Sequence, residues 1–383
     1  MTTATRTRKY TRPTSGITEA LYVAFELGVD EWKVGFTRDL EAKPRVRTMP
    51  ARDLKQLARE ITAAKHWFAL PAKTPVRSCY EAGRDGFWLH RYLVTSGIDN
   101  RVVDSASIEV NRRQRRAKSD GLDARKLLTM LLRYHAGESK VWSVVRVPTV
   151  EEEDRRQLHR ELRTWKQERT RTLNRIHGLL ASQGLRLPTG HDVSGRLEAM
   201  RLWNGAPLPA GLRARVQREL DHAQFLHAKI LELQRQRSWA IKHERGEAIA
   251  KVRQLLRLRG IGENGAWVYV NEFFGWRQFK NRKEVGAAAG LVPTPYQSGD
   301  GKQELGISKA GNRHIRAVAI EMAWSWLRFQ PGSQLSRWFE ARFSRGGPRA
   351  RKIGIVAVAR KLLIDMWRFL RDGAVPEGAL LKA

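Results

Sequence analysis

The first 150 or so residues alternate between short apolar runs and amphipathic segments. Residues 21–37 carry apolar side chains in partial alternation around the polar stretch Gly-Val-Asp-Glu, a pattern typical of a β-hairpin. Beyond it, the spacing predicts a helix, a strand, a helix, a strand and a closing helix at about 53–68, 75–83, 86–97, 100–105 and 120–135. Strands and helices in this order predict an α/β domain with a mixed sheet.

The pattern changes after residue 150 to long amphipathic helices. From about 151 to 184, apolar residues keep helical spacing while seven arginines lie among the other positions. The stretch 184–195 interrupts this pattern, and a second long helix is expected from about 209 to 249. Together they predict an antiparallel helical arm. Its arginines are either a solvated helix face or part of an arm that pairs two copies of the chain or grips nucleic acid.

The last third of the chain predicts a mostly α-helical domain. A helix of small residues is expected at 285–290 and a basic amphipathic helix at 350–370. Between them we expect a proline-flanked loop that carries Ser298, then a glycine-rich basic segment that opens a helix with Ser308 as its cap.

These patterns divide the chain into four parts. They are a disordered basic arm, the α/β domain, the helical arm and the C-terminal helical domain, at 1–18, 19–148, 149–250 and 251–375. The first part is polar and lacks the apolar core of a secretory signal.

The charge of the chain points to nucleic acid. It has 71 Lys and Arg against 39 Asp and Glu, a formal net charge of +32, while a hydrophobic content of 42% is enough for folded cores. Charge of this size spread along a whole chain is usually neutralised by DNA or RNA. No apolar run approaches the roughly 18 residues of a membrane span, so no membrane partner is expected.

The single cysteine, Cys79, excludes an internal disulfide framework and a cysteine-rich zinc site. It suits a reducing compartment, and we expect a cytoplasmic protein. The ten histidines show no HxxxH spacing, which argues against zinc.

The stretch RRQRRAKSDGLDARKLL, residues 112–128, places two acids inside a strongly basic run. Asp120 and Asp123 are three residues apart, so on a helix they share a face. They are either an N-cap with a first-turn acid, or ligands of a cation. The basic residues just before them are candidate phosphate contacts: Arg112, Arg113, Arg115, Arg116 and Lys118.

Two further acids favour the cation site. Glu26 stands among apolar residues of a predicted strand, and Glu81 ends another predicted strand just before Gly83. Closely spaced carboxylates repel one another unless cations join them. Oxygen-rich clusters suit Mg²⁺ or Mn²⁺, and two such ions about 3.5–4 Å apart can hold the attacking and leaving oxygens of a phosphoryl transfer.

The order of these acids resembles the D-E-D-D tetrad of a RuvC-like domain with the RNase H fold. The chain as a whole, from about 21 to 370, resembles the transposases of the insertion sequence one-ten family. The C-terminal part of the resemblance is carried by LRGIG, by AAAGLVPTPYQSGDGKQELGISKAGNRHIR and by ARKLL.

The resemblance implies a recombinase that excises and inserts its own mobile element. It implies that Glu26, Glu81, Asp120 and Asp123 bind Mg²⁺ and that Ser298 attacks donor or target DNA and becomes covalently linked to it. It also implies a target chosen with a structured non-coding "bridge" RNA. Since strand exchange acts on four strands, we expect an even-numbered homo-oligomer, a dimer or a tetramer.

One position departs from the family pattern, which usually has Asp where this chain has Glu26. The extra methylene moves the carboxylate by about 1.5 Å. Asp30 is an alternative ligand, and Ser308 is an alternative nucleophile. The basic segment around Ser308 is a candidate phosphate-contact cluster, formed by Lys302, Lys309, Asn312, Arg313 and Arg316.

Two other functions fit the same residues. A junction-resolving endonuclease would use metal-activated water instead of the serine. A non-catalytic nucleic-acid-binding protein would need only the charge. Several tryptophans among the arginines could stack on unpaired bases, although most are expected to be core: Trp32, Trp88, Trp142, Trp165, Trp203 and Trp338.

Overall fold

The computed structural model describes residues 19–108, 120–186, 193–298 and 301–382. The side chains of residues 106, 120–123, 193–194, 196, 295–298 and 301–305 lie outside the description. So does the predicted basic arm, 1–18. The chain divides into two compact units, 1–147 and 148–383, which are described in turn.

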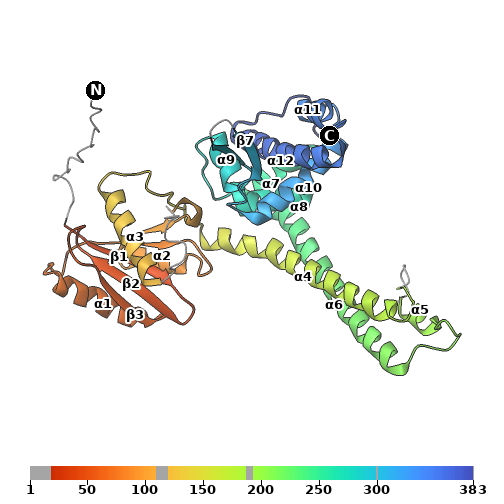
Figure 1. Ribbon diagram of the computed structural model, residues 1–383, viewed down its shortest axis with the longest axis horizontal. Coiled ribbons are helices and arrows are strands. Elements are labelled where there is room, and N and C mark those ends of the chain that lie inside the picture. Colours follow the sequence, from red (N-terminus) through yellow and green to blue (C-terminus); the bar gives the residue numbers. More distant parts are fainter. Residues whose placement is uncertain (1–18, 109–119, 187–192, 299–300, 383) are drawn as a thin grey trace. The chain divides into compact units, whose positions relative to one another are not determined.

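The first unit is built on a five-stranded mixed sheet (Figure 1). Its strands are β1 (Leu21–Leu27), β2 (Glu31–Thr37), β3 (Arg45–Pro50), β4 (Val76–Glu81) and β5 (Asp99–Val103), in the order β3-β2-β1-β4-β5. The β1–β2 and β2–β3 pairs are antiparallel, whereas β1–β4 and β4–β5 are parallel. The predicted hairpin and mixed sheet are therefore confirmed.

Helices cover both faces of this sheet. Helices α1 (Leu54–Trp67) and α2 (Trp88–Thr95) share a core with Leu21, Val23 and Phe25 of β1. Helix α3 (Asp120–His135) packs on the other face, where Tyr22 and Ala24 point. A short 3₁₀ turn, Ser105–Ser107, follows β5. Successive strand residues thus alternate between the two helical layers.

The local pattern predicted α1, α2, α3, β4 and β5 but missed β3. That strand reads Arg-Val-Arg-Thr-Met-Pro, and Met49 is its buried residue. It lies at the edge of the sheet, where a largely exposed strand needs little apolar alternation and where charge protects against edge-to-edge pairing.

The second unit begins with two long helices that pack side by side, α4 (Val150–Ala181) and α6 (Ala210–His243) (Figure 1). Thr149 and Glu152 form a reciprocal capping box at the start of α4. The short helix α5 (Val193–Ala199) lies between them in the sequence. The antiparallel arm is confirmed, but the predicted extension of α6 to residue 249 is wrong. The chain breaks at Gly246, whose φ of 119° is not helical, and α7 (Glu247–Leu256) is separate.

The rest of the unit is a helical bundle with one small hairpin. Its elements after α7 are α8 (Glu263–Tyr269) continuing as a π-helical turn (Val270–Phe274), α9 (Arg282–Ala288), β6 (Pro293–Ser298), β7 (Gly301–Ile307), α10 (Arg313–Phe329), α11 (Gln334–Phe343) and α12 (Gly347–Asp372). Trp267 and Trp326 are among the largest fully buried side chains of its core. Across the described residues, no helix is both long and apolar enough to cross a membrane.

Two predictions for this unit are wrong. Ser298 does not lie in a loop: it is the last residue of β6, which pairs with β7 in a two-stranded ribbon. Proline is tolerated there because such a ribbon consists only of edge strands. Ser308 is not the cap of α10. That cap is Asn312, whose side chain accepts hydrogen bonds from the backbone N–H groups of residues 314 and 315.

A buried carboxylate ties the arm to the bundle within the second unit. Glu272, 2% exposed, accepts hydrogen bonds from Arg160 Nε (3.2 Å) and a terminal guanidinium nitrogen (2.7 Å), and from Asn312 Nδ2 (3.0 Å). His159 Nε2 lies 3.1 Å from the same carboxylate. Burial alone would raise the pKa of Glu272, but the hydrogen bonds and charges of His159 and Arg160 lower it to about 2.

We expect Glu272→Gln to weaken this junction. A carboxyl whose folded-state pKa lies below its unfolded value contributes stability above that unfolded value and loses it as the pH falls toward 2. At about 1.4 kcal/mol per pKa unit, the contribution at pH 7 is about 3 kcal/mol. Amide hydrogen exchange of peptides around residues 159 and 272 should be faster in Glu272→Gln. It should be unchanged in Glu340→Gln, whose side chain is exposed on α11. Equal protection in both variants would contradict this role.

Candidate active site

Two predicted site residues lie next to each other at the carboxyl ends of β1 and β4. The parallel register pairs Phe25 with Tyr80, so Glu26 and Glu81 follow as neighbours on adjacent strands. The residues that flank them alternate consistently: Phe25 and Tyr80 belong to the core under α1 and α2, and Ala24 and Cys79 to the core under α3. Both glutamates therefore project from the α3 face of the sheet.

A cavity of about 330 Å³ opens at this edge. Glu26, half-buried, and Glu81, exposed, line it together with Arg84 and Asp85 from the turn after β4. Asp85 is held by ion pairs at 3.6 Å to Arg52 and 3.8 Å to Arg84. In open α/β sheets ligands bind outside the carboxyl ends of the strands, which is where this cavity lies.

Lys33 lies directly opposite Glu26 on β2. Because Trp32 and Val34 point into the α1–α2 core, Lys33 projects from the same face as Glu26. Glu26 therefore has a cation across one neighbouring strand and a second carboxylate across the other. A lysine here reduces the repulsion between the two acids.

Helix α3 runs antiparallel to β1 and begins over this edge. Its last residue, His135, packs edge-to-face on Tyr22, with 5.8 Å between ring centroids. Closer to the start of α3, Leu128 and Ala124 lie over Gly35 of β2, which pairs with Ala24 of β1. A Cβ added to Gly35 would lie 2.8 Å from the Leu128 side chain and 3.7 Å from that of Ala124. One more turn toward the helix start leads to Asp123 and Asp120, in the direction of Glu26 along β1. Their side chains lie outside the described residues.

The donors at this edge suit a hard cation. Carboxylate oxygens are the ligands that Mg²⁺ and Mn²⁺ prefer, and two lie side by side here. Within the described side chains, His, Cys, Asp and Glu form no group of three or more that could hold a metal ion. A site with more ligands would need the side chains of Asp120 and Asp123. Asp30, the alternative ligand, is exposed in the turn between β1 and β2.

The predicted nucleophile lies in the other unit. Ser298 pairs with Gly301 at one end of the β6–β7 ribbon. The base of the ribbon is fixed to the bundle: the N–H of Ser308 donates to the Val292 carbonyl at 2.8 Å, and Arg316 donates to the carbonyls of Ala289 and Lys309 at 3.2 and 3.1 Å. The backbone thus places Ser298 at one end of the ribbon and the alternative Ser308 beside the other, anchored end.

The predicted phosphate-contact cluster divides into two kinds of residue. Asn312 caps α10 and donates to Glu272, and Arg316 braces the ribbon, so both side chains serve the fold. Lys309 and Arg313 are exposed. The side chain of Lys302 and the whole predicted run Arg112, Arg113, Arg115, Arg116 and Lys118 lie outside the described residues.

Residues that the sequence did not single out also shape these regions. Lys33 and Asp85 lie beside the paired glutamates, and Glu272 anchors the segment that carries the ribbon. Lys33 could have been found from the hairpin register, whereas Glu272 and Asp85 look like ordinary charged residues in the sequence. Of the six tryptophans considered for base stacking, Trp32 and Trp142 are buried in the core, and Trp203 is 91% exposed.

Comparison with known proteins gives a consistent result. A family model described as the IS116/IS110/IS902 transposase family matches residues 252–338. The y4rJ protein of Sinorhizobium fredii, named as a transposase, is 41% identical over 95% of both chains. A transposase for the insertion sequence element IS1111A from Coxiella burnetii is 25% identical over 90% of this chain and 85% of its own. A transposase for the element IS1328 from Yersinia enterocolitica is 27% identical over 57% of this chain and 63% of its own.

We expect Gly35→Val to displace α3 from the glutamate pair. Its Cβ would lie 2.8 Å from the Leu128 side chain, closer than real contacts allow. Overpacking of a core costs about 1–3 kcal/mol, which should lower the thermal stability of the first unit. Gly178→Ala is the control, since its Cβ meets nothing within 4 Å and alanine favours helix. Unchanged melting of Gly35→Val would show that α3 does not pack closely here.

Proposed function

We propose that this chain, which belongs to the IS116/IS110/IS902 family of transposases, cuts and rejoins DNA through a serine–DNA intermediate with the help of a carboxylate-bound Mg²⁺ or Mn²⁺. The observation that carries the proposal is the placement of Glu26 beside Glu81, on one face of the sheet and beneath the start of α3. A sheet built only for stability would gain nothing from two acids in adjacent positions.

The fold of the first unit is proposed to be RuvC-like, of the RNase H class. Its mixed sheet of order β3-β2-β1-β4-β5, with helices on both faces, supports this proposal. The parallel pairing of β1 with β4 matters for function, because it brings two carboxyl ends together at one edge.

Glu26 and Glu81 would hold the cation, with Asp120 and Asp123 completing the ligand set from the start of α3. When bound, the cation would stabilise negative charge on the phosphate and on the leaving oxygen. Lys33 beside Glu26 would keep that carboxylate oriented and partly neutralised between catalytic events.

Ser298 would supply the nucleophile. Its oxygen attacks a DNA phosphorus, the P–O bond to one DNA end breaks, and that end leaves as a hydroxyl after taking up a proton. The other end stays joined to Ser298 through a phosphodiester. Because this link conserves the bond energy of the backbone, a hydroxyl of a new DNA end can attack it and restore an intact strand without an external energy source.

A water-based endonuclease is the second candidate, since the same acid pair could activate water. It would release hydrolysed ends and could not rejoin strands.

We also propose, from the resemblance noted above, that a structured non-coding RNA guides the choice of DNA and that the working form is a dimer or tetramer. The net charge of +32 supports a partnership with more nucleic acid than the cut strand alone.

We expect Mn²⁺ to bind the full chain at the proposed acid cluster. Glu81→Gln, Asp120→Asn and Asp123→Asn should each weaken Mn²⁺ binding by about 10- to 100-fold and abolish strand cleavage. Electron paramagnetic resonance of free Mn²⁺ measures the binding. Glu60→Gln on α1, whose carboxylate pairs with Arg45 and Arg47, is the control and should bind normally. Strand exchange that survives in the aspartate variants would contradict the assignment of Asp120 and Asp123 as ligands of a catalytic cation.

The serine step has its own test. Ser298→Ala should leave no covalent protein–DNA adduct on a denaturing gel and should lose strand exchange, because the hydroxyl that forms the link is gone. Ser308→Ala at the anchored base of the ribbon should keep the adduct. If Ser298→Ala still cuts DNA and yields only hydrolysed ends, the endonuclease is the correct assignment.

A further inference from the structure

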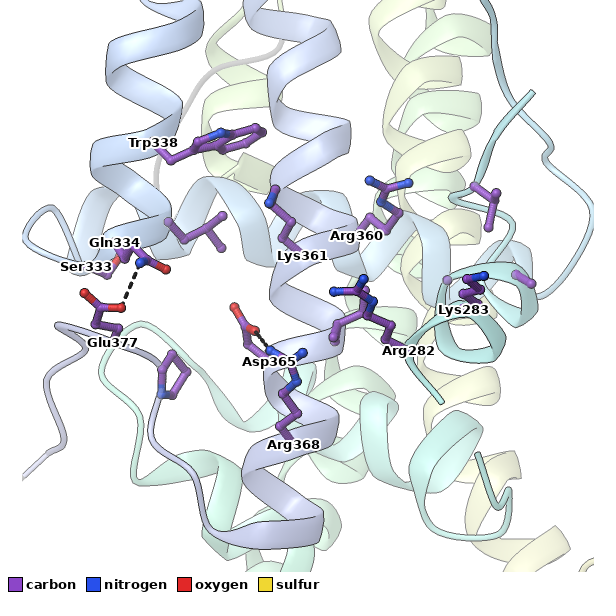
Figure 2. A pocket seen from close by; sticks show the side chains of 16 residues that line it. Arg282, Lys283, Ser333, Gln334, Trp338, Arg360, Lys361, Asp365, Arg368 and Glu377 are labelled. Carbon is purple, nitrogen blue, oxygen red and sulfur yellow. Dashed lines mark hydrogen bonds and ion pairs between the residues drawn. The ribbon is translucent and has the colours of Figure 1, made fainter. Parts of the chain in front are cut away.

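A second, larger cavity lies in the C-terminal bundle, and Val292, directly before β6, is one of its lining residues. It has a volume of about 900 Å³, and α9, α11, α12 and the segment around Glu377 form its walls (Figure 2). That volume is at the upper end of the roughly 300–1,000 Å³ typical of ligand clefts. We call it the α12 groove.

The walls of the α12 groove are strongly basic. Five cations line it: Arg282 and Lys283 from α9, and Arg360, Lys361 and Arg368 from α12. The three on α12 share a face with Ile364 and Asp365, because their spacing follows the helical period. Figure 2 shows all five cationic side chains around the groove.

Few of these charges are balanced by acids. Arg368 pairs with Asp365 at 3.7 Å. Glu377, the other acid of the groove, accepts a hydrogen bond from Gln334 at 2.7 Å. In the described part of the chain, the remaining four cations form no ion pair. Five cations against two acids leave the groove with a net positive charge that attracts an anion, and their distribution over α9 and α12 offers contacts to more than one phosphate.

An aromatic ring completes the groove. Trp338 of α11 is half-buried, and the Lys361 ammonium lies 4.7 Å from its ring centroid. Phe343 packs edge-to-face against Trp338 at 5.4 Å and fixes the ring. Val292, Leu335 and Ile364 add apolar surface. An indole held rigid beside cations is the combination that binds a base and its phosphates.

We propose that the α12 groove binds an unpaired DNA strand, with a base stacked on Trp338 and the backbone phosphates on Arg360, Lys361, Arg282 and Lys283. An unpaired strand is required because a base within a duplex has no free face for the indole. DNA is favoured over RNA because the family acts on DNA, and the inference therefore rests on the proposed function. It goes further by identifying where the protein holds a strand that is separated during strand exchange.

The test is binding of a fluorescent oligothymidine to the full chain in EDTA, where neither the metal site nor Ser298 chemistry operates. Arg360→Ala with Lys361→Ala should weaken binding about tenfold and reduce the slope of log affinity against log salt by about 1.4, the value for two lost phosphate contacts on a single strand. The matched control is Arg351→Ala with Lys352→Ala, which removes the same charge from exposed positions of α12 outside the groove.

The second measurement locates the base. An oligonucleotide with 5-iodouracil should crosslink to Trp338 on irradiation, as mapped by mass spectrometry, and Trp338→Leu should remove that crosslink while the double control variant keeps it. Circular dichroism melting checks that each variant folds.

Three results would overturn the inference: equal weakening by the groove and control pairs, crosslinking with RNA but not DNA, or binding of duplex with the same dependence on Arg360 and Lys361. These assays need no DNA cleavage. A negative result in them would therefore not contradict the serine mechanism, and a protein without that mechanism could still be tested for binding at the α12 groove.

Discussion

The parallel pairing of β1 with β4 is the constraint on which the proposed chemistry depends. It joins strands that are about fifty residues apart in sequence and aligns Phe25 with Tyr80. Since strand side chains alternate, that one register sends Glu26 and Glu81 to the same face and the same edge. A slip of one residue in either strand would turn its glutamate into the α1–α2 core, where an unpaired carboxylate is costly. The apolar residues that fill both cores therefore also fix the position of the acids.

Acids have distinct roles in a chain with this much positive charge. Glu272 is buried and fully engaged by Arg160, His159 and Asn312, so it organises the joint between the arm and the bundle. Glu26 and Glu81 stand beside a cavity at the surface of the sheet. The difference is one of surroundings, because hydrogen-bond donors surround the first carboxylate inside the bundle, whereas the other two line a cavity.

The basic side chains divide in the same way. Arg316 donates hydrogen bonds to backbone carbonyl groups, and Arg160 donates to the Glu272 carboxylate. Arg360 and Lys361 face a groove together with an aromatic ring. A high net charge is therefore a poor guide to which residues meet nucleic acid, and the hydrogen-bond partner of each side chain is a better one.

The sequence by itself determined the helices and strands that have a clear apolar period. It also indicated nucleic acid as the partner. The hairpin, α1 to α4, β4, β5 and α12 follow from the period of their apolar residues, and nucleic acid follows from the charge. It also singled out Glu26, which stands among apolar residues of a strand, and Glu81, which ends another strand.

Only the tertiary structure decided which of these residues meet. Strand order, the shared face of Glu26 and Glu81, the edge strand β3 and the β6–β7 ribbon depend on pairing between segments that local periodicity does not relate. Asn312 caps α10 and also donates a hydrogen bond to Glu272. The α12 groove forms because α9 and α11 pack beside α12. Such contacts draw their free energy from burial and hydrogen bonding between residues distant in sequence, and a local pattern carries no record of them.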